Sequence, residues 1–221
     1  MKFLKRHAYA LVFTLFLMGA NVYSLLKVFV IPSAVSTVSA NTTSSTTASS
    51  TASTSTGKVT KTDTTYKDDN MDIKITTGKT SDTTYYVADI KLSSADYLKT
   101  ALAQNTYGTN ITETTSSIAQ QNNAIFAING DYYGANQSGY VIKNGQVYRD
   151  TDRNSDYEDL AVYSDGSFKT FKESDTTAQK LVDSGVVNTF AFGPTLVENG
   201  KIAVSDNEEV GQAMADNPRT A

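Results

Sequence analysis

An amide and a carboxylate follow directly after an apolar run near the middle of the chain. Residues 124–128 carry no polar side chain, and Asn129, Gly130 and Asp131 come next. Because Asn-Gly tolerates a positive φ, a turn here would present Asp131 at the end of a buried strand. A carboxylate in that place could act as a general acid or base, act as a nucleophile or stabilise a positive charge. The alternative is an Asx turn, in which Asp131 only caps its own backbone.

Two phenols complete this segment. The rings of Tyr132 and Tyr133 could stack on a bound ligand, and the amide of Asn129 could hydrogen-bond to it. In the structural alternative, both tyrosines fill a core behind the strand and Asn129 only forms the turn.

The absence of two residue types limits the chemistry. The sequence has no cysteine, and its single histidine, His7, lies near the N-terminus. Within these residues this excludes disulfides, cysteine nucleophiles, Ser-His-Asp triads and histidine-based metal sites. A reaction must therefore use carboxylates, hydroxyls, phenols, amides and the arginines after the N-terminal part, which are Arg149, Arg153 and Arg219.

One acidic stretch resembles a calcium-binding loop in its spacing. Oxygen-bearing side chains alternate at Asp152, Asn154 and Asp156. The sixth position of such a loop would be Tyr157 instead of glycine, and the twelfth would be Tyr163 instead of glutamate. We therefore predict a solvated acidic loop and no cofactor, with a weak divalent-ion site as the alternative.

The N-terminal part has the composition of a leader and a tether. Basic residues precede an uncharged run of nineteen residues, 8–26, which predicts a membrane anchor or a signal segment at 1–32. Val38-Ser39-Ala40 would suit cleavage of such a signal. Ser and Thr make up 21 of the 33 residues in 33–65, which predicts a flexible tether. We expect residues 66–221 to lie outside the cytoplasm, either membrane-anchored with the N-terminus inside the cell or secreted.

The charge changes sign at the same boundary. Residues 1–65 carry a net charge of +5 and residues 66–221 carry −9. An acidic domain without a basic stripe is a poor binder of nucleic acid, so no nucleic-acid partner is expected.

The mixed order of strands, helices and hairpins predicts an α+β fold with a largely antiparallel sheet and a few packed helices. Alternating residues predict paired strands, and three Asn-Gly or Asp-Gly turns predict hairpins. The expected strands and hairpins are 71–77 with 85–92, the buried strand 124–128, and the hairpins 139–149, 160–171 and 195–204. The expected helices are 95–104, 116–122, one from a cap at Ser174 or Asp175 to Gly185, and 208–215.

Three segments in this order resemble the phosphodiester glycosidase family: Ile128–Tyr133, Phe190–Leu196 and Asn217–Ala221. The resemblance runs from about Met71 to Ala221 and includes the hairpin 139–149. The family includes the uncovering enzyme that removes N-acetylglucosamine from its phosphodiester on mannose 6-phosphate, and bacterial members linked to exopolysaccharide. The resemblance implies hydrolysis of sugar-1-phosphodiester linkages in cell-surface or extracellular glycans.

The same resemblance implies that Arg219 would clamp the phosphate. Asp131 is the candidate catalytic carboxylate because the expected Asn129-Gly130 turn would fix it at a strand end, whereas family members also carry other residues at this position, glycine among them. Asn129, Gly130, Tyr132 and Tyr133 would bind the sugar, and Gly193 with Pro194 would shape a loop lining the site. In the structural alternative, Arg219 pairs with a carboxylate at the start of a strand and Gly193-Pro194 is a rigid turn.

The chain departs from the family at its end. In the family the Asn-Pro-Arg-Thr-Ala segment begins further strands that lead to a glycine-rich acidic loop, whereas this sequence ends at Ala221. We therefore expect a domain that is incomplete at its C-terminus and needs further residues for activity. Two alternatives remain open: a non-catalytic module that binds glycan through Tyr132 and Tyr133, and an inactive fragment.

Overall fold

The computed structural model describes residues 2–34, 59–131, 133–153 and 158–204. Helices and antiparallel strands mix along these residues, which confirms the predicted α+β class. The chain divides into two compact units. The first consists of Met1–Thr37 and Ala101–Gln137, and the second of Val38–Thr100 and Ser138–Ala221.

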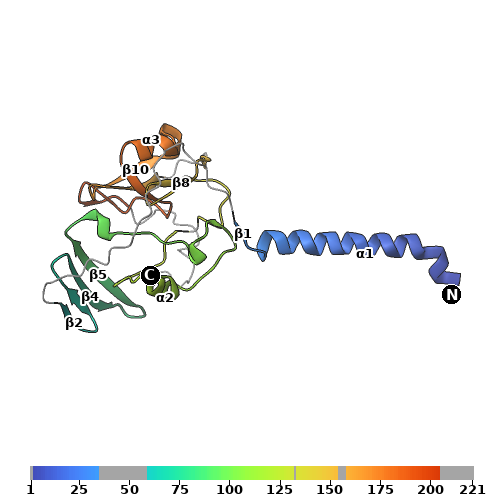
Figure 1. Cartoon of the computed structure of the whole chain (residues 1–221), viewed down its shortest axis with the longest axis horizontal. Coiled ribbons are helices and arrows are strands. Elements are labelled where there is room, and N and C mark those ends of the chain that lie inside the picture. The colour runs from blue at the N-terminus through green and yellow to red at the C-terminus, as the bar shows by residue number, and fades with distance from the viewer. Residues whose placement is uncertain (1, 35–58, 132, 154–157, 205–221) are drawn as a thin grey trace. The chain divides into compact units, whose positions relative to one another are not determined.

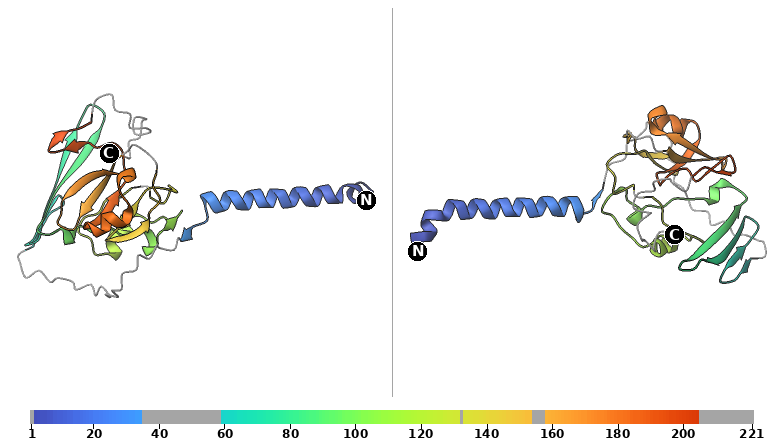
Figure 2. Two further views of the ribbon diagram at one scale, coloured as in Figure 1. Left: turned by 90° about the horizontal axis from the view of Figure 1, so that it is seen from above. Right: turned by 180° about the vertical axis from the view of Figure 1, so that it is seen from behind.

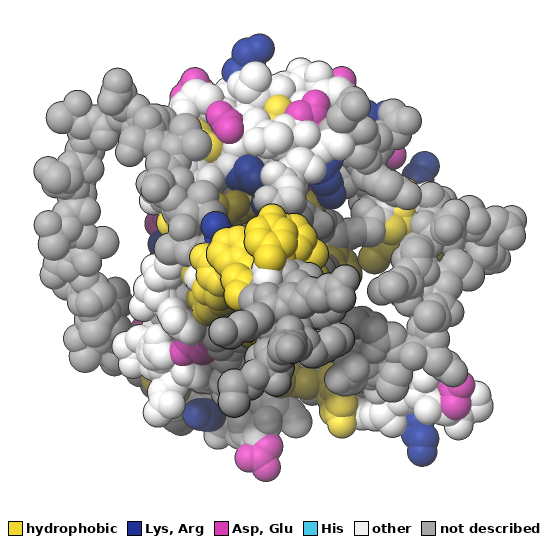
Figure 3. Space-filling view, turned by 90° about the vertical axis from the view of Figure 1, so that its right-hand side faces the viewer, with side chains coloured by type: hydrophobic (Ala, Val, Ile, Leu, Met, Phe, Trp, Pro, Cys, Tyr) yellow, Lys and Arg dark blue, Asp and Glu magenta, His cyan; other side chains and the backbone are white. Residues whose placement is uncertain are grey.

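A single long helix, α1 (Lys2–Phe29), begins the first unit (Figures 1 and 2). Many of its hydrophobic side chains are exposed, and Figure 3, which looks along this helix, shows them gathered there. Among the described residues, no helix combines the length and the apolar character that crossing a membrane requires. A helix thus forms where residues 1–32 predict a membrane anchor or signal, but the membrane assignment itself is not supported.

The rest of the first unit is built from short elements. They are β1 (Ser33–Ala34), η2 (Ala103–Asn105), β6 (Gly108–Thr109) and α2 (Thr115–Gln121), and β1 pairs with β6 in antiparallel register. The helix predicted at 116–122 is confirmed as α2. It begins where the Thr114 hydroxyl accepts the Ser117 N–H at 3.3 Å.

The buried strand predicted at 124–128 is wrong. These residues form irregular chain after α2, and Ile128 is 74% exposed. A strand covered on both faces needs neighbouring strands and packing layers, and no described strand pairs with this run. The Ala124 N–H instead donates to Ala119 O at 2.9 Å and closes the end of α2.

The helix predicted at 95–104 is also wrong. Only two single 3₁₀ turns form there: η1 (Ala95–Tyr97) in the second unit and η2 in the first. Ser94 caps η1 as expected, but Leu98 is extended and Gln104 has φ 52°. Leu98 is exposed, so the segment lacks the tertiary packing that stabilises most short helices.

A four-stranded antiparallel sheet opens the second unit. It consists, in order, of β2 (Thr60–Lys61), β3 (Thr65–Lys67), β4 (Met71–Lys79) and β5 (Thr84–Leu92). β4 and β5 pair along their whole length, from Met71 opposite Leu92 to Lys79 opposite Thr84. The predicted pair 71–77 and 85–92 is therefore confirmed.

All three predicted hairpins form in the second unit. They are β7 (Val141–Lys143) with β8 (Gln146–Arg149), β9 (Glu158–Tyr163) with β10 (Phe168–Lys172), and β12 (Val197–Glu198) with β13 (Lys201–Ile202). At the first turn both Asn144 and Gly145 have positive φ, 52° and 79°, as the Asn-Gly pair predicts. β11 (Val186–Phe190) pairs with β9 and completes the order β10-β9-β11.

The helix α3 (Ala178–Asp183) packs against this part of the second unit, near β8 in Figure 1. Ala178 and Leu181 of this helix belong to the hydrophobic core. The other buried core residues are Tyr140, Ile142, Val147, Ala161 and Val186. The cap of α3 is Thr177, not the predicted Ser174 or Asp175, which belong to the 3₁₀ turn η3 (Glu173–Asp175). The helix predicted at 208–215 lies outside the described residues.

Candidate functional site

Residues 129–131, where the turn was predicted, lie in the first unit after α2. The prediction of a turn is wrong, because these residues form irregular chain and neither Asn129 nor Gly130 has a positive φ. Asn129 and Gly130 are exposed, whereas Asp131 is half-buried. The half-buried ring of Tyr133 stacks on Tyr107, with 5.4 Å between ring centroids and 19° between the ring planes. Tyr132 lies outside the described residues. Asp131 and the stacked ring of Tyr133 are therefore two residues apart in the chain. The strand that was expected to present them does not form.

The other predicted site residues lie elsewhere. Gly193 and Pro194 follow β11 in the second unit, and Gly193 is exposed with φ +70°, in the region that favours glycine. Next to them, the Thr195 hydroxyl donates to Glu158 Oε2 at 2.6 Å and ties this loop to β9. Arg219 lies outside the described residues, so its predicted role as a phosphate clamp stays a prediction.

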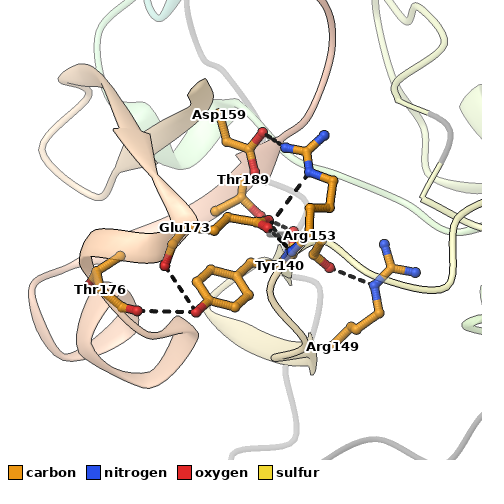
Figure 4. A network of polar contacts seen from close by, with 8 residues as sticks. Tyr140, Arg149, Arg153, Asp159, Glu173, Thr176 and Thr189 are labelled. Atoms are coloured by element: carbon orange, nitrogen blue, oxygen red, sulfur yellow. Dashed lines mark hydrogen bonds and ion pairs between the residues drawn. The ribbon is translucent and has the colours of Figure 1, made fainter. Parts of the chain in front are cut away.

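A buried network of charged and polar residues lies in the second unit (Figure 4). Its centre is Glu173, at the end of β10. The Glu173 carboxylate accepts hydrogen bonds from the backbone N–H of Tyr140 and, at 2.6 Å, from that of Arg153. The carboxylate thus joins the start of β7 to the segment that follows β8.

The Arg153 guanidinium lies between two carboxylates. Its Nη2 donates to Asp159 Oδ1, and its Nε lies 3.7 Å from Glu173 Oε2. The side chains of Asp159 and Glu173 are only 1% and 3% exposed, whereas that of Arg153 is 22% exposed. One guanidinium charge therefore faces two carboxylates that solvent hardly reaches.

This excess of buried negative charge shifts the pKa of Asp159. Its pKa is raised to about 7: burial is the largest cause, the neighbouring Glu173 carboxylate acts in the same direction, and the charge of Arg153 opposes the shift. Asp159 Oδ2 is buried without a hydrogen-bond partner. Both observations indicate that Asp159 holds a proton near neutral pH.

Tyr140 belongs to the same network. Its hydroxyl donates to Thr176 O at 3.1 Å and to Glu173 O at 3.3 Å. Burial raises the pKa of Tyr140, and the negative charges of Asp152 and Glu173 act in the same direction. The phenol is therefore a buried neutral donor that connects β7 with the η3 turn.

Side chains of β11 hold the β7–β8 hairpin. The Thr189 hydroxyl accepts the Ile142 N–H at 3.0 Å and donates to Tyr140 O at 3.2 Å. Lys143 Nζ donates to Thr189 O at 2.8 Å and lies 4.0 Å from the centre of the Phe190 ring. These contacts fix β7 to β11 through side chains and backbone groups.

Gly139 brings the two arginines of this region to one point of the backbone. Its C=O accepts the Arg149 Nε–H at 2.5 Å, and its N–H donates to Thr151 O at 2.7 Å. Its φ is +101°, and a Cβ at this position would lie 3.2 Å from Arg153 Cγ. Only glycine fits both the conformation and the space.

The network is built to hold structure rather than to touch a substrate. Asp159 and Glu173 are enclosed, so a glycan cannot contact them. Neither carboxylate was predicted from the sequence, because Asp159 lies at the start of β9 and Glu173 directly follows β10, where an acid is usually solvated. A signal was present at Asp159, which directly precedes the apolar run of β9.

The possible divalent-ion site is only partly described. Asp152 is exposed, while Asn154 and Asp156 lie outside the described residues. In the described part of the chain, no group of three or more acidic, histidine or cysteine side chains could hold a metal ion.

Comparison with known proteins agrees with the family resemblance. Residues 122–221 match the family model of phosphodiester glycosidases. This range contains the three motif segments and the hairpin 139–149, whereas residues 71–121 lie outside it. The resemblance predicted from the motifs is thereby confirmed for residues 122–221.

A curated relative is similar over a comparable length. It is the SPbeta prophage-derived uncharacterized protein YomE of Bacillus subtilis (strain 168), which is 29% identical over 119 residues. These residues cover 52% of this chain and 18% of the relative, so the chain spans less than a fifth of that protein. No solved structure matches the chain at a significant level.

Proposed function

We propose that residues 122–221 contribute to a domain that hydrolyses glycosyl phosphodiesters in cell-surface or extracellular glycans. The match of these residues to the phosphodiester glycosidase family carries the proposal. The chemistry suits a chain whose described part offers carboxylates and phenols. Cleavage at the anomeric carbon expels a phosphate monoester, which needs charge neutralisation more than protonation, and a carboxylate stabilises the cationic sugar.

Within this function we assign the roles that the motifs imply. Asp131 is the catalytic carboxylate, and its half-buried place at the end of an irregular segment supports the assignment. Arg219 neutralises the leaving phosphate. The sugar is bound by Asn129, Gly130, Tyr132 and Tyr133, and the loop at Gly193 and Pro194 shapes the site.

The test is release of free sugar from an N-acetylglucosamine 1-phosphodiester by the full-length protein. Asp131→Asn should lower kcat by about 10²- to 10⁴-fold, the usual effect of losing an acid–base group. Arg219→Ala should lower it by about 10²-fold or more, because the leaving charge is no longer neutralised. Asp165→Asn is the control, since Asp165 is an exposed acid in the β9–β10 turn.

Two results would distinguish a wrong function from wrong roles for Asp131 and Arg219. No sugar release by the full-length protein would refute the function itself. Sugar release that is undiminished in Asp131→Asn and Arg219→Ala would keep the function and refute the two roles.

One observation favours a non-catalytic alternative, a glycan-binding module. The stacked pair of Tyr107 and Tyr133 offers an aromatic surface without needing a catalytic group. This alternative predicts calorimetric binding of N-acetylglucosamine oligosaccharides with no turnover, and equal affinity in Asp131→Asn.

We also propose that the domain acts outside the cytoplasm. The support is in the sequence: basic residues before an uncharged run, then a tether rich in serine and threonine. External protease should degrade residues 66–221 on intact cells while a cytoplasmic marker survives. Protection equal to that of the marker would refute export.

A further inference from the structure

Two segments of the first unit, residues 107–108 and 133–134, meet at an aromatic pair. The rings of Tyr107 and Tyr133 stack at 5.4 Å, almost parallel. Tyr107 is only 7% exposed, whereas Tyr133 is half-buried. The buried ring thus supports one that still reaches solvent.

The backbone beside the rings is equally close. A Cβ at Gly134 would lie 3.0 Å from Gly108 O, so only glycine allows this approach without a shift. Gly108 is buried and belongs to β6, where it pairs with Ala34 of β1. Tyr107 is therefore anchored by the strand that it precedes, and it holds the Tyr133 ring from that anchor.

The position of Tyr133 in the chain indicates what its supported ring could bind. It follows Asp131 by two residues, so a ring fixed at this point lies close in the chain to the proposed catalytic carboxylate. The flat apolar face of a pyranose stacks well on an aromatic ring. Binding to a ring that is already fixed avoids the cost of ordering a mobile side chain.

We propose that Tyr107 is a positioning residue that holds Tyr133 as the stacking surface for a hexose or N-acetylhexosamine ring of the substrate. The inference rests on the proposed function. It adds a residue that no motif contains, and it places the sugar-binding contact in the first unit.

The experiment compares Tyr107→Leu with Tyr107→Phe in the full-length protein, using an N-acetylglucosamine 1-phosphodiester as substrate. Tyr107→Leu removes the supporting ring and should raise KM by about 2- to 10-fold, the effect of one mobile side chain that binding must order, with kcat nearly unchanged. Tyr107→Phe keeps the ring and should restore the wild-type KM. Tyr86→Leu is the control, because Tyr86 is an exposed tyrosine of β5 in the other unit.

A second readout is independent of turnover. Calorimetric titration with N-acetylglucosamine should show the same loss of affinity in Tyr107→Leu and the same recovery in Tyr107→Phe. If no sugar is released but this pattern holds, the proposed function fails and the stacking surface stands. If sugar is released and neither KM nor affinity changes in Tyr107→Leu, the inference is wrong.

Gly134→Ala covers the case in which Tyr107→Leu fails to fold. The added methyl pushes residues 133–134 away from Gly108 O and should weaken sugar binding while both tyrosines remain. A folded Gly134→Ala protein with wild-type affinity for N-acetylglucosamine would also overturn the inference.

Discussion

Replacing Asp159 with asparagine should remove most of the pH dependence of the unfolding free energy between about pH 4 and about pH 7. Burial raises the pKa of Asp159 from 3.8 to about 7 in the folded chain. Between these values the folded protein holds a proton that the unfolded chain has lost, so stability falls as the pH rises and is constant above about pH 7. A difference of about 3 pH units corresponds to about 4 kcal/mol.

The geometry explains why the proton resides on Asp159. The Glu173 carboxylate already accepts two backbone N–H groups, and one guanidinium, that of Arg153, serves both acids. Asp159 Oδ2 has no hydrogen-bond partner, so protonation removes a buried charge at little cost. Asparagine has the same shape and stays neutral at every pH. The variant should equal the wild type below about pH 4 and be more stable near pH 8, by up to about 4 kcal/mol.

Urea unfolding of the full chain, followed by circular dichroism from about pH 4 to about pH 8, measures this difference. The matched control is Asp165→Asn in the neighbouring turn. Hydrogen bonds from Ser167 lower the pKa of Asp165. Asp165 therefore stabilises the folded chain above the ordinary pKa of an aspartate, and this stabilisation is lost as the pH falls, which is the opposite pH dependence to that of Asp159. The reasoning is refuted if Asp159→Asn keeps the wild-type slope, or if it is the less stable protein at pH 8.

Three further substitutions test the surroundings of the network by the same unfolding measurement. Gly139→Ala should destabilise by about 1–3 kcal/mol, because φ is +101° and the new methyl meets Arg153; no loss would mean that the backbone relaxes freely. Ile142→Ala should cost about 2–5 kcal/mol, since this side chain is fully buried, and a smaller loss would indicate a collapsed cavity. Thr189→Val should cost about 1–3 kcal/mol by leaving the Ile142 N–H unpaired, and a neutral result would contradict that role.

The hairpins could be predicted because their cause is local. An Asn-Gly pair needs only its own backbone to adopt two positive φ values, as Asn144 and Gly145 do. The alternation of β4 and β5 is local in the same sense. Helix α2 also follows from its own cap at Thr114.

The failures occurred where a segment depends on partners far away in the chain. The run 124–128 is apolar enough for a buried strand, but apolar character alone does not supply the neighbours that such a strand pairs with. The segment 95–104 has a helical pattern and a good cap, yet Leu98 has no core to pack against. The periodicity of a segment indicates which side chains it could bury, and the tertiary structure determines whether they are buried.

The buried network could not be predicted for the same reason. Its central hydrogen bond joins Tyr140 to Glu173, which are 33 residues apart. No turn chemistry or periodicity links positions at that separation. The pairing of β9 with β10 brings Asp159 and Glu173 together, and the Arg153 N–H donates to Glu173 from the segment after β8.

The proposed site residues 129–131 and the enclosed carboxylates of the network should therefore respond differently to substitution. Asn129 and Gly130 are exposed and Asp131 is half-buried, so changing residues 129–131 should alter turnover while the unfolding transition stays nearly in place. Asp159 and Glu173 are enclosed, so changing them should alter stability and its pH dependence, while the KM of the folded fraction stays unchanged. A substitution in the network that changed KM without changing stability would show that the enclosed carboxylates communicate with the sugar site, which their burial argues against.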